Sequence, residues 1–243
     1  MRQTNNIATL LQQSTHLLTK SLTPRLDAEV ILASALKTNR TWLYANSDSI
    51  VSPEETAAYL VKVKERGKGV PVPYITGCCE FWSLPLSITP DVLIPRPETE
   101  LLVAMTLEII KRSPSRLSMA DLGTGSGAVA LAVASETDQP MIAATDLSLS
   151  ALRVAKRNLH QLDYKNVIVL AGSWLNPFGR KSLDIIVANP PYIGREESHL
   201  TDAAIKFEPA IALFSKNDGM QEIDCIIVQA SKCLKQDGWI LLE

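Results

Sequence analysis

Apolar and polar positions follow a helical rhythm over the first seventy residues of this chain. Five apolar positions approximate one face of a first helix: Ile7, Leu10, Leu11, Leu17 and Leu18. Thr23-Pro24 has the form of an N-cap followed by proline in the first turn, and predicts a helix from Arg25 to about Leu36. The segment Ser52–Glu55 has the spacing of a capping box, so a further helix is expected to run to Arg66 and to stop at Gly67.

The pattern changes between residues 71 and 97, where six prolines are expected to break any helix: Pro71, Pro73, Pro85, Pro90, Pro95 and Pro97. Within this stretch, Glu80-Phe81-Trp82 and Leu84–Ile88 predict a short hairpin. The high proline content indicates a stiff connector rather than a flexible one. A helix from Glu98 to Arg112 is expected to follow it.

From Leu117 onward the chain alternates between strand-like and helix-like segments. Strands are predicted at 117–122, 140–145, 167–171, 183–188 and 239–242, and helices at about 127–136, 149–161 and 219–234. Such alternation is typical of a parallel, doubly wound sheet, so the fold class is α/β and Rossmann-like. We therefore expect three parts: a small helical domain at 1–70, a proline-rich hairpin linker at 71–97 and a sheet domain at 98–243.

Composition narrows the class of protein without identifying it. The 243 residues are 46% hydrophobic and 21% charged, which is ordinary for a globular protein, and no apolar run approaches the length of a membrane span. The net charge of −2 is split, with a basic excess of three in residues 1–70 and an acidic excess of five in residues 71–243. An acidic sheet domain argues against a nucleic-acid footprint. The four cysteines show neither zinc-site spacing nor a disulfide pattern, which favours a reduced, cytoplasmic location without a bound metal.

A glycine-rich motif closes the first predicted strand and opens the helix after it. It reads Asp121-Leu122-Gly123-Thr124-Gly125-Ser126-Gly127. Glycines allow a ligand to approach the backbone closely, and the start of a helix presents unpaired N–H groups. The third glycine comes one residue earlier than in the dinucleotide fingerprint, so the loop does not predict a dinucleotide.

Two further residues follow the next two strands. Asp146 ends the second strand, where a carboxylate is placed to accept both hydroxyls of a ribose; it is equally suited to cap the helix that begins near Ser148. Trp174 follows the third strand, beside the expected position of an adenine ring, although the hydrophobic core is an equally good place for it. With the glycine loop, these residues indicate an adenosine-bearing cofactor.

The fourth strand ends in Asn189-Pro190-Pro191-Tyr192, which we call the tetrad. Two prolines cannot donate to a strand ladder, so the chain is expected to turn rigidly at the carboxyl edge of the sheet. The Asn189 amide oxygen and the Pro190 carbonyl can together accept both hydrogens of a planar –NH2 group, beside the aromatic face of Tyr192. A plain strand-ending turn accounts for the prolines alone.

Taken together, these motifs resemble those of class I S-adenosylmethionine-dependent methyltransferases, and the flanking segments resemble one family among them. Tyr74–Gly77, Glu80–Trp82 and Leu93–Glu100 are similar to the linker of release factor glutamine methyltransferases (the PrmC/HemK family). Phe207–Leu213 and Asp218-Gly219 are similar to the segment that follows the tetrad in that family.

The resemblance implies transfer of a methyl group from S-adenosyl-L-methionine, which leaves as S-adenosyl-L-homocysteine. The acceptor would be the side-chain amide nitrogen of the glutamine in the Gly-Gly-Gln motif of class 1 peptide chain release factors. It further implies that the cofactor is held by Gly123, Thr124, Gly125, Ser126, Gly127, Asp146, Trp174 and Asn189. The glutamine would be held by Asn189, Pro190, Pro191 and Tyr192, with Asn189, Pro190 and Tyr192 as the catalytic residues.

Three questions stay open at this point. An adenine amino-methyltransferase acting on nucleic acid would use the same tetrad, and a fragment that binds the cofactor without turnover would keep the same fold. Members of the family continue past the fifth strand with a further helix and two strands, so the resemblance leads us to expect a chain truncated at its C-terminus. Arg96 and Glu98 either help to close the active site or pair with each other to fix the linker, and we favour the structural function.

Overall fold

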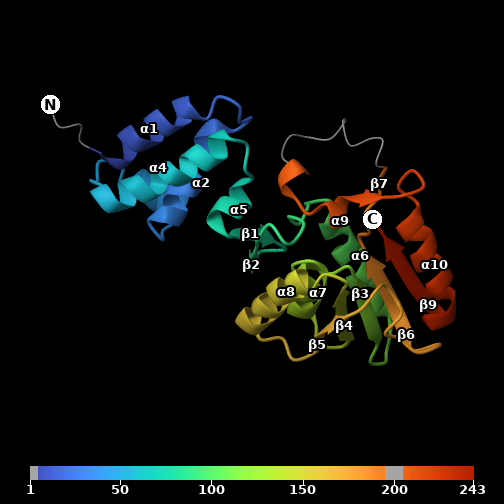
Figure 1. Cartoon of the computed structure of the whole chain (residues 1–243). Helices are drawn as coiled ribbons and strands as arrows, with labels where there is room; N and C mark the ends of the chain where they lie inside the picture. The colour runs from blue at the N-terminus through green and yellow to red at the C-terminus, as the bar shows by residue number, and fades with distance from the viewer. Residues whose placement is uncertain (1–4, 195–204) are drawn as a thin grey trace. The chain divides into compact units, whose positions relative to one another are not determined.

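The computed structural model describes residues 5–194 and 205–243, and the chain divides into two compact units, Met1–Gly77 and Cys78–Glu243 (Figure 1). The first unit is helical. Its helices are α1 (Ile7–Leu17), α2 (Pro24–Ala35), α3 (Arg40–Ala45), α4 (Pro53–Gly67) and α5 (Val72–Thr76). They enclose a core of aliphatic side chains around the fully buried Tyr59.

Several predicted details of this unit are confirmed and others are wrong. The capping box of Ser52 and Glu55 forms as predicted. Leu17 does not belong to the buried face of α1, since it is 63% exposed. Thr23 occupies the N-cap position of α2 but makes no capping hydrogen bond; its hydroxyl donates to the Asp27 carboxylate. Gly67 is the last residue of α4 and has an ordinary helical backbone; the left-handed turn comes at Gly69, where φ is 99°.

Two short helices were not predicted. Asn39 begins α3, and its side chain accepts a hydrogen bond from the Trp42 N–H group. Helix α5 forms although Pro71 and Pro73 flank its first residue, because proline is tolerated in a first helical turn, where no intrahelical N–H bond is needed. The expectation that prolines exclude all helix from this stretch was therefore wrong.

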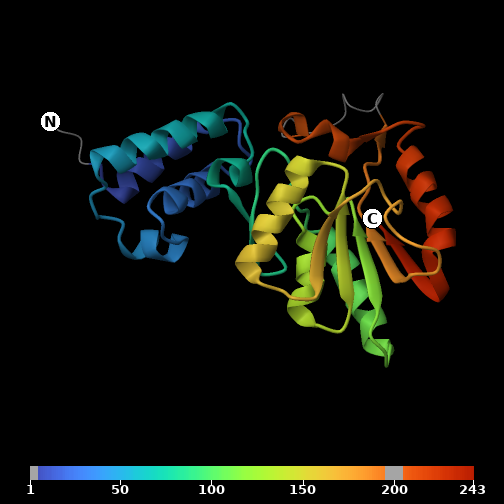
Figure 2. The ribbon, with the colours of Figure 1, turned by 60° about the horizontal axis from the view of Figure 1, so that its bottom comes forward.

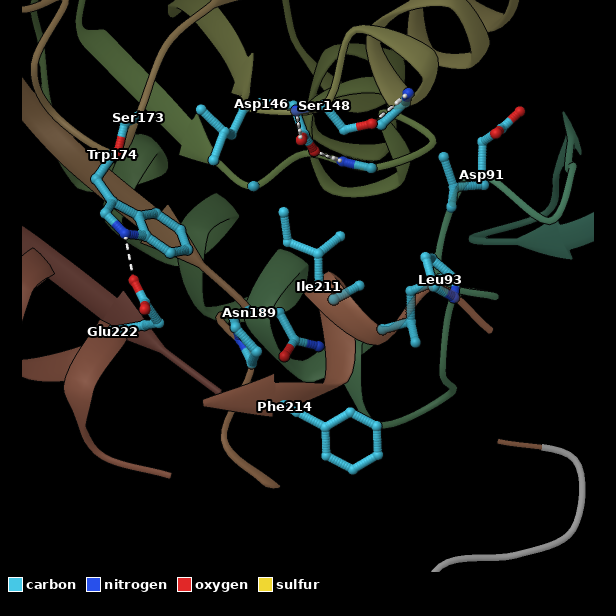
Figure 3. A pocket seen from close by; sticks show the side chains of 18 of the residues that line it. Asp91, Leu93, Asp146, Ser148, Ser173, Trp174, Asn189, Ile211, Phe214 and Glu222 are labelled. Atoms are coloured by element: carbon cyan, nitrogen blue, oxygen red, sulfur yellow. Dashed lines mark hydrogen bonds between the residues drawn. The ribbon is translucent and has the colours of Figure 1, made fainter. Parts of the chain in front are cut away.

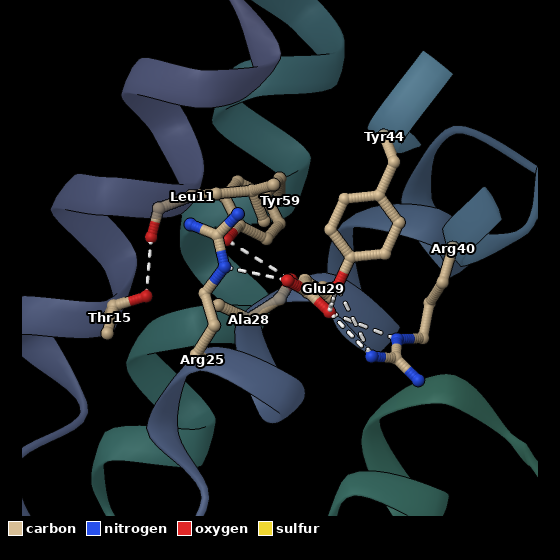
Figure 4. A network of polar contacts seen from close by, with 8 residues as sticks. All are labelled: Leu11, Thr15, Arg25, Ala28, Glu29, Arg40, Tyr44 and Tyr59. Atoms are coloured by element: carbon tan, nitrogen blue, oxygen red, sulfur yellow. Dashed lines mark hydrogen bonds and ion pairs between the residues drawn. The ribbon is translucent and has the colours of Figure 1, made fainter. Parts of the chain in front are cut away.

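One carboxylate organises the polar side of the helical unit (Figure 4). The side chain of Glu29 is only 2% exposed, and it accepts hydrogen bonds from Arg25 at 2.6 Å, Arg40 at 2.9 Å and the Tyr44 hydroxyl at 2.7 Å. Burial by itself would raise the pKa of Glu29, but these three donors outweigh it and the pKa is lowered. The network compensates the buried charge, so we assign it to the stability of this unit.

The second unit is built on a five-stranded sheet, and the predicted α/β class is confirmed. Its strands are β3 (Ser118–Leu122), β4 (Met141–Asp146), β5 (Val167–Ala171), β6 (Leu183–Ala188) and β9 (Leu234–Leu242), all parallel in the order β5-β4-β3-β6-β9. The sheet runs to the red β9 at one edge (Figure 2). All five strands lie where the sequence predicted them, although β9 begins five residues earlier than expected.

Helices α6 (Thr99–Arg112), α7 (Ala128–Glu136), α8 (Leu149–Leu162) and α10 (Gln221–Cys233) connect and flank these strands. The chain passes from β3 through β4 to β5 toward one edge, and from β6 to β9 toward the other. Because such crossovers are right-handed, α7 and α8 cover one face and α10 covers the opposite one. Ligands bind in open sheets of this kind at the carboxyl ends of the strands, where the order reverses.

Smaller elements surround the sheet. The predicted hairpin is present as β1 (Cys78–Phe81) and β2 (Leu84–Ser87). Its loop residues Trp82 and Ser83 both have positive φ, 51° and 60°, as a type I′ turn requires. Two carboxylates hold this turn: Glu100 accepts from the Trp82 backbone N–H, and Glu136 accepts from the Trp82 indole.

After the tetrad the chain forms a second parallel pair that was not predicted. Strand β7 (Ile193–Gly194) pairs with β8 (Phe214–Ser215), which follows the 3₁₀ turn η2 (Ile205–Phe207) and the short helix α9 (Ala210–Leu213). This pairing brings residues 209–214 beside the end of the tetrad.

Candidate functional site

A cavity of about 300 Å³ lies at the carboxyl ends of the sheet strands (Figure 3). Its walls include residues that directly follow four strands: Gly123 after β3, Asp146 at the end of β4, Gly172 after β5 and Asn189 after β6. The volume is that of a small-molecule site. The sheet topology therefore brings the glycine loop, Asp146 and the tetrad to one edge, as expected.

The glycine loop needs its glycines for two separate reasons. Gly123, Gly125 and Gly127 have φ of 68°, 56° and 85°, a region that residues with a Cβ rarely adopt. At Gly123 a Cβ atom would also lie 3.3 Å from the Trp174 ring. Only a glycine at this position lets the indole lie directly against the loop backbone.

Asp146 connects the loop to the next helix. One carboxylate oxygen accepts from the Ser148 N–H at 2.8 Å and the other from the Gly125 N–H at 2.9 Å. Ser148 itself caps α8, accepting from the Ala151 N–H group. Burial raises the pKa of Asp146, and these backbone donors lower it only in part. A carboxylate has about four acceptor positions in all, so Asp146 keeps the capacity to accept hydroxyl groups.

A second, deeper carboxylate lies under the loop. Asp121 is 3% exposed, and one of its oxygens accepts from the Thr124 hydroxyl at 2.5 Å and from the Ala130 N–H at 3.2 Å. The pKa of Asp121 is raised to about 6, chiefly by burial and to a lesser degree by the nearby Asp146, although the Thr124 and Ala130 donors lower it in part. Through its bond to Asp121, the Thr124 hydroxyl fixes the conformation of the glycine loop.

Asn158 of α8 braces the loop from the side of the hairpin. Its Oδ1 accepts from the Ser87 N–H at 2.7 Å, and its Nδ2 donates to the Ser87 carbonyl at 3.1 Å and to the Ser126 carbonyl at 2.8 Å. The side chain is 1% exposed. A single buried amide therefore joins β2, α8 and the glycine loop, a function that nothing in the sequence pattern indicated.

Trp174 lines the cavity in a strained conformation. Its φ is 46°, and its indole N–H donates to the Glu222 carboxylate at 2.8 Å. Glu222 comes from the first turn of α10 and lines the cavity as well. The backbone strain at Trp174 is held by this bond and by the fit of the ring against Gly123.

The tetrad contributes to the cavity with only part of its residues. Asn189 and Pro191 line it, whereas Pro190 is buried and Tyr192 is 52% exposed. The Asn189 Nδ2 group donates to the Thr99 hydroxyl at 3.2 Å. The backbone of Tyr192 packs so closely on Gly219 that a Cβ there would lie 2.1 Å from the Tyr192 carbonyl oxygen.

The remaining walls come from two segments to which the sequence assigned no contact with the cofactor or substrate. One wall is formed by Asp91, Val92 and Leu93, and another by Pro209, Ile211, Ala212 and Phe214. Both lie in or beside segments on which the family resemblance rested, which was the one signal that pointed to them. The wall is completed by Leu147, Ser148 and Ser173, which lie next to predicted residues in sequence, and by Ala151 of α8.

An ion pair joins residues that lie close to these two segments in the chain. The Arg96 guanidinium donates to both oxygens of Glu208 at 2.8 and 2.9 Å, and the Glu208 side chain is 1% exposed. Burial raises the pKa of Glu208, and Arg96 lowers it again in part. The partner of Arg96 is therefore Glu208 and not Glu98, which corrects one of the two expectations for this residue.

The predicted site residues thus fall into two groups. Gly123, Gly125, Asp146, Trp174, Asn189 and Pro191 meet at one cavity. Thr124, Ser126, Gly127, Pro190 and Tyr192 are not among the described residues that line it. For this second group a contact with cofactor or substrate stays a prediction. Among the described residues, no three His, Cys, Asp or Glu side chains gather in a way that could hold a metal ion.

Residues 9–77 match the model of the PrmC N-terminal domain, and residues 99–217 match that of the methyltransferase small domain. The chain is 45% identical over 230 residues to the release factor glutamine methyltransferase of Coxiella burnetii, covering 95% of this chain and 82% of that protein. The same-named protein of Escherichia coli strain K12 is 38% identical over 233 residues, covering 96% of this chain and 83% of its own length.

A solved structure of related fold is the hMettl16 catalytic domain in complex with MAT2A 3'UTR hairpin 6. Its TM-score is 0.50 at 15% identity, with 75% of this chain and 64% of that chain covered. The likeness supports the fold alone. In the described part of the chain, no helix has the length and apolar character needed to cross a membrane.

Proposed function

The chain belongs to the family of release factor glutamine methyltransferases, and from this membership we propose the reaction that it catalyses. It transfers a methyl group from S-adenosyl-L-methionine to the side-chain amide nitrogen of the glutamine in the Gly-Gly-Gln motif of class 1 peptide chain release factors. The observation that carries the proposal is the 45% identity to one such enzyme over 95% of this chain. The position of Asn189 on the same cavity as the glycine loop supports it.

The cavity fits the proposed cofactor in size and in chemistry. Gly123 leaves the space that a Cβ would fill, and the Trp174 ring offers a flat apolar face there. Asp146 would accept the two ribose hydroxyls with its remaining lone pairs. Gly125, Ser126 and Gly127 would contribute through the loop backbone, whose shape Thr124 and Asn158 maintain. When bound, S-adenosyl-L-methionine supplies a methyl group on a positively charged sulfur, and S-adenosyl-L-homocysteine leaves once the carbon–nitrogen bond has formed.

The tetrad would orient the glutamine. A carboxamide nitrogen is a poor nucleophile because its lone pair is delocalised into the carbonyl group. We propose that Asn189 Oδ1 and the Pro190 carbonyl each accept one hydrogen of the glutamine –NH2, that Pro191 closes the wall and that Tyr192 packs on the planar amide. Held in this way, the lone pair faces the methyl carbon, and positioning supplies much of the acceleration. The nitrogen exchanges one hydrogen, lost as a proton, for the methyl group.

The two units have separate proposed functions. Residues 1–70 would recognise the substrate protein, residues 71–97 would serve as the linker, and residues 98–243 would carry out the transfer. The match of residues 9–77 to an N-terminal domain model supports a separate helical domain, although that match extends past residue 70 to Gly77, as the first compact unit does. The cytoplasm stays the proposed location, since it is a reducing compartment in which the four cysteines, which form no disulfide, remain thiols.

The test is a transfer assay with tritiated cofactor, the full chain and a purified release factor. We expect label in the wild-type factor and none in a variant whose Gly-Gly-Gln glutamine is changed to glutamate. Label in DNA or RNA alone would instead identify an adenine amino-methyltransferase, and cofactor binding without any transfer would identify an inactive fragment.

Asn189→Ala tests the assignment of the tetrad. We expect kcat to fall about 100-fold or more, because the amide acceptor is lost, while cofactor affinity stays within about twofold. Gln161→Ala, which removes an exposed amide at the far end of α8, is the matched control and is expected to leave kcat unchanged. Collapse of cofactor affinity in Asn189→Ala would contradict the division between cofactor and substrate residues.

A further inference from the structure

The chemistry proposed for Asn189 depends on which end of its side-chain amide faces the glutamine. The Oδ1 end accepts hydrogen bonds, whereas the Nδ2 end only donates them. If Nδ2 faced the substrate, its hydrogens would oppose those of the glutamine –NH2. Pro190 restricts the backbone of Asn189 but leaves both side-chain torsions free. Something outside the tetrad must therefore select the amide orientation.

Thr99 contacts the Asn189 amide from outside the tetrad. Its Oγ1 accepts from Asn189 Nδ2 at 3.2 Å, across 90 positions of sequence, and the residue is 5% exposed. With the Nδ2 end held against Thr99, Oδ1 is the end that remains for a ligand in the cavity. Thr99 itself is not among the described residues that line the cavity, so it would act through Asn189.

The position of Thr99 suits this function better than a local structural one. It is the first residue of α6, yet the N-cap position belongs to Glu98, and no side chain caps this helix. Threonine is β-branched, so its χ1 angle is restricted to few rotamers and its hydroxyl to few positions. By contrast, the hydroxyl of Thr106 on the same helix donates to the Leu102 carbonyl within α6.

We propose that Thr99 is a positioning residue for the methyl transfer, fixing the Asn189 amide with its oxygen toward the glutamine nitrogen. This inference rests on the proposed function. It predicts that loss of the Thr99 hydroxyl lowers the rate of transfer without weakening the binding of cofactor or release factor, because Thr99 is not among the described residues that line the cavity.

The experiment compares Thr99→Val, which keeps the shape and removes the acceptor, with Thr99→Ser, which restores it. Thr106→Val is the matched control, since it removes a buried hydroxyl from the same helix without contact to Asn189. We expect Thr99→Val to lower kcat about 10- to 100-fold with KM for the release factor and Kd for the cofactor within about twofold. Thr99→Ser is expected to retain kcat within about threefold, and Thr106→Val to leave it unchanged.

A second readout does not depend on activity. In protein labelled with ¹⁵N at asparagine, the side-chain –NH2 signals of Asn189 are assigned by their loss in Asn189→Ala. We expect these signals to shift in Thr99→Val and to stay in place in Thr99→Ser and Thr106→Val. If Thr99→Val does not fold, as judged by cofactor binding, Thr99→Ala takes its place in both measurements.

The outcomes separate this inference from the proposed function. A wild-type chain that methylates no release factor would contradict the proposed function, while the Asn189 signals would still decide whether Thr99 holds the amide. An active wild-type chain with an equally active Thr99→Val variant would overturn the inference and leave the function standing. Equal loss of kcat in Thr99→Val and Thr106→Val would also overturn it, because the effect would then be one of helix packing.

Discussion

The brace formed by Asn158 allows a stability prediction whose size follows from its three hydrogen bonds. In Asn158→Leu the side chain keeps its branching and its number of non-hydrogen atoms, but the Ser87 N–H, the Ser87 carbonyl and the Ser126 carbonyl all lose their amide partner. The side chain that replaces it is apolar and equally buried, so water does not replace these bonds. The cost is therefore that of polar groups left without a partner.

The magnitude can be built from the burial of each group. An unsatisfied buried group costs about 1–3 kcal/mol. The Ser126 carbonyl is buried, so its cost lies near the upper end of this range. The two Ser87 groups are half-buried, so their costs lie near the lower end. The expected loss is about 3–5 kcal/mol, a large part of the ~5–15 kcal/mol by which domains are stable.

The assay is urea unfolding followed by tryptophan fluorescence, since Trp82, Trp174 and Trp239 all belong to the unit that contains Asn158. With an m-value of about 2 kcal/mol/M, the midpoint is expected to fall by about 2 M. Gln161→Leu on the exposed end of α8 is the control and is expected to stay within about 0.5 kcal/mol of the parent. A loss below about 1 kcal/mol in Asn158→Leu, or an equal loss in the control, would refute the reasoning.

Three further changes test other contacts. Gly219→Ala would place a methyl group 2.1 Å from the Tyr192 carbonyl oxygen, at a φ of +87°. We therefore expect a loss of stability of about 2 kcal/mol or more in thermal unfolding and a matching loss of transfer activity. An unchanged Tm would contradict this prediction. Arg96→Leu leaves the buried Glu208 carboxylate without its partner. We expect a loss of stability of about 2–3 kcal/mol at pH 7.5 that shrinks toward pH 5 as Glu208 becomes protonated, and a smaller loss in Glu208→Gln. Equal losses at both pH values would exclude an uncompensated charge as the cause. The folded-state pKa of Asp121 is raised to about 6 from 3.8, so its contribution favours the folded state below pH 3.8 and is lost as the pH rises through 6. Asp121→Asn is therefore expected to gain stability relative to the parent between pH 4 and 7. Parallel profiles of stability against pH would contradict the assignment.

The elements of the sheet unit were predictable because each one satisfies its own local pattern. The five strands are short apolar runs bounded by polar or turn residues, and their order along the chain alternates with helices. The details that failed were those decided by distant contacts. Nothing local marks α5, and nothing local pairs β7 with β8, because these elements depend on segments elsewhere in the chain.

The same distinction holds for the candidate site: residues marked by a local pattern were predicted, and residues defined by a distant contact were not. The glycine loop, Asp146 and Asn189 were found because turn chemistry and strand ends are visible in sequence, and parallel strands bring their carboxyl ends to one edge. Glu222, Asn158 and Glu208 carry no local signature, because a buried amide or carboxylate has meaning only through the group that it contacts.

By itself, then, the sequence determined the α/β class, the strand order along the chain and the residues at the strand ends, since these follow from periodicity and backbone preference. The tertiary structure alone decided which of those residues share a cavity, how Asn158 and Asp121 support the loop and that Thr99 lies against Asn189. The physical reason is range: backbone preference acts over a few neighbouring residues, whereas the Asn189 amide is hydrogen-bonded to a hydroxyl 90 positions away.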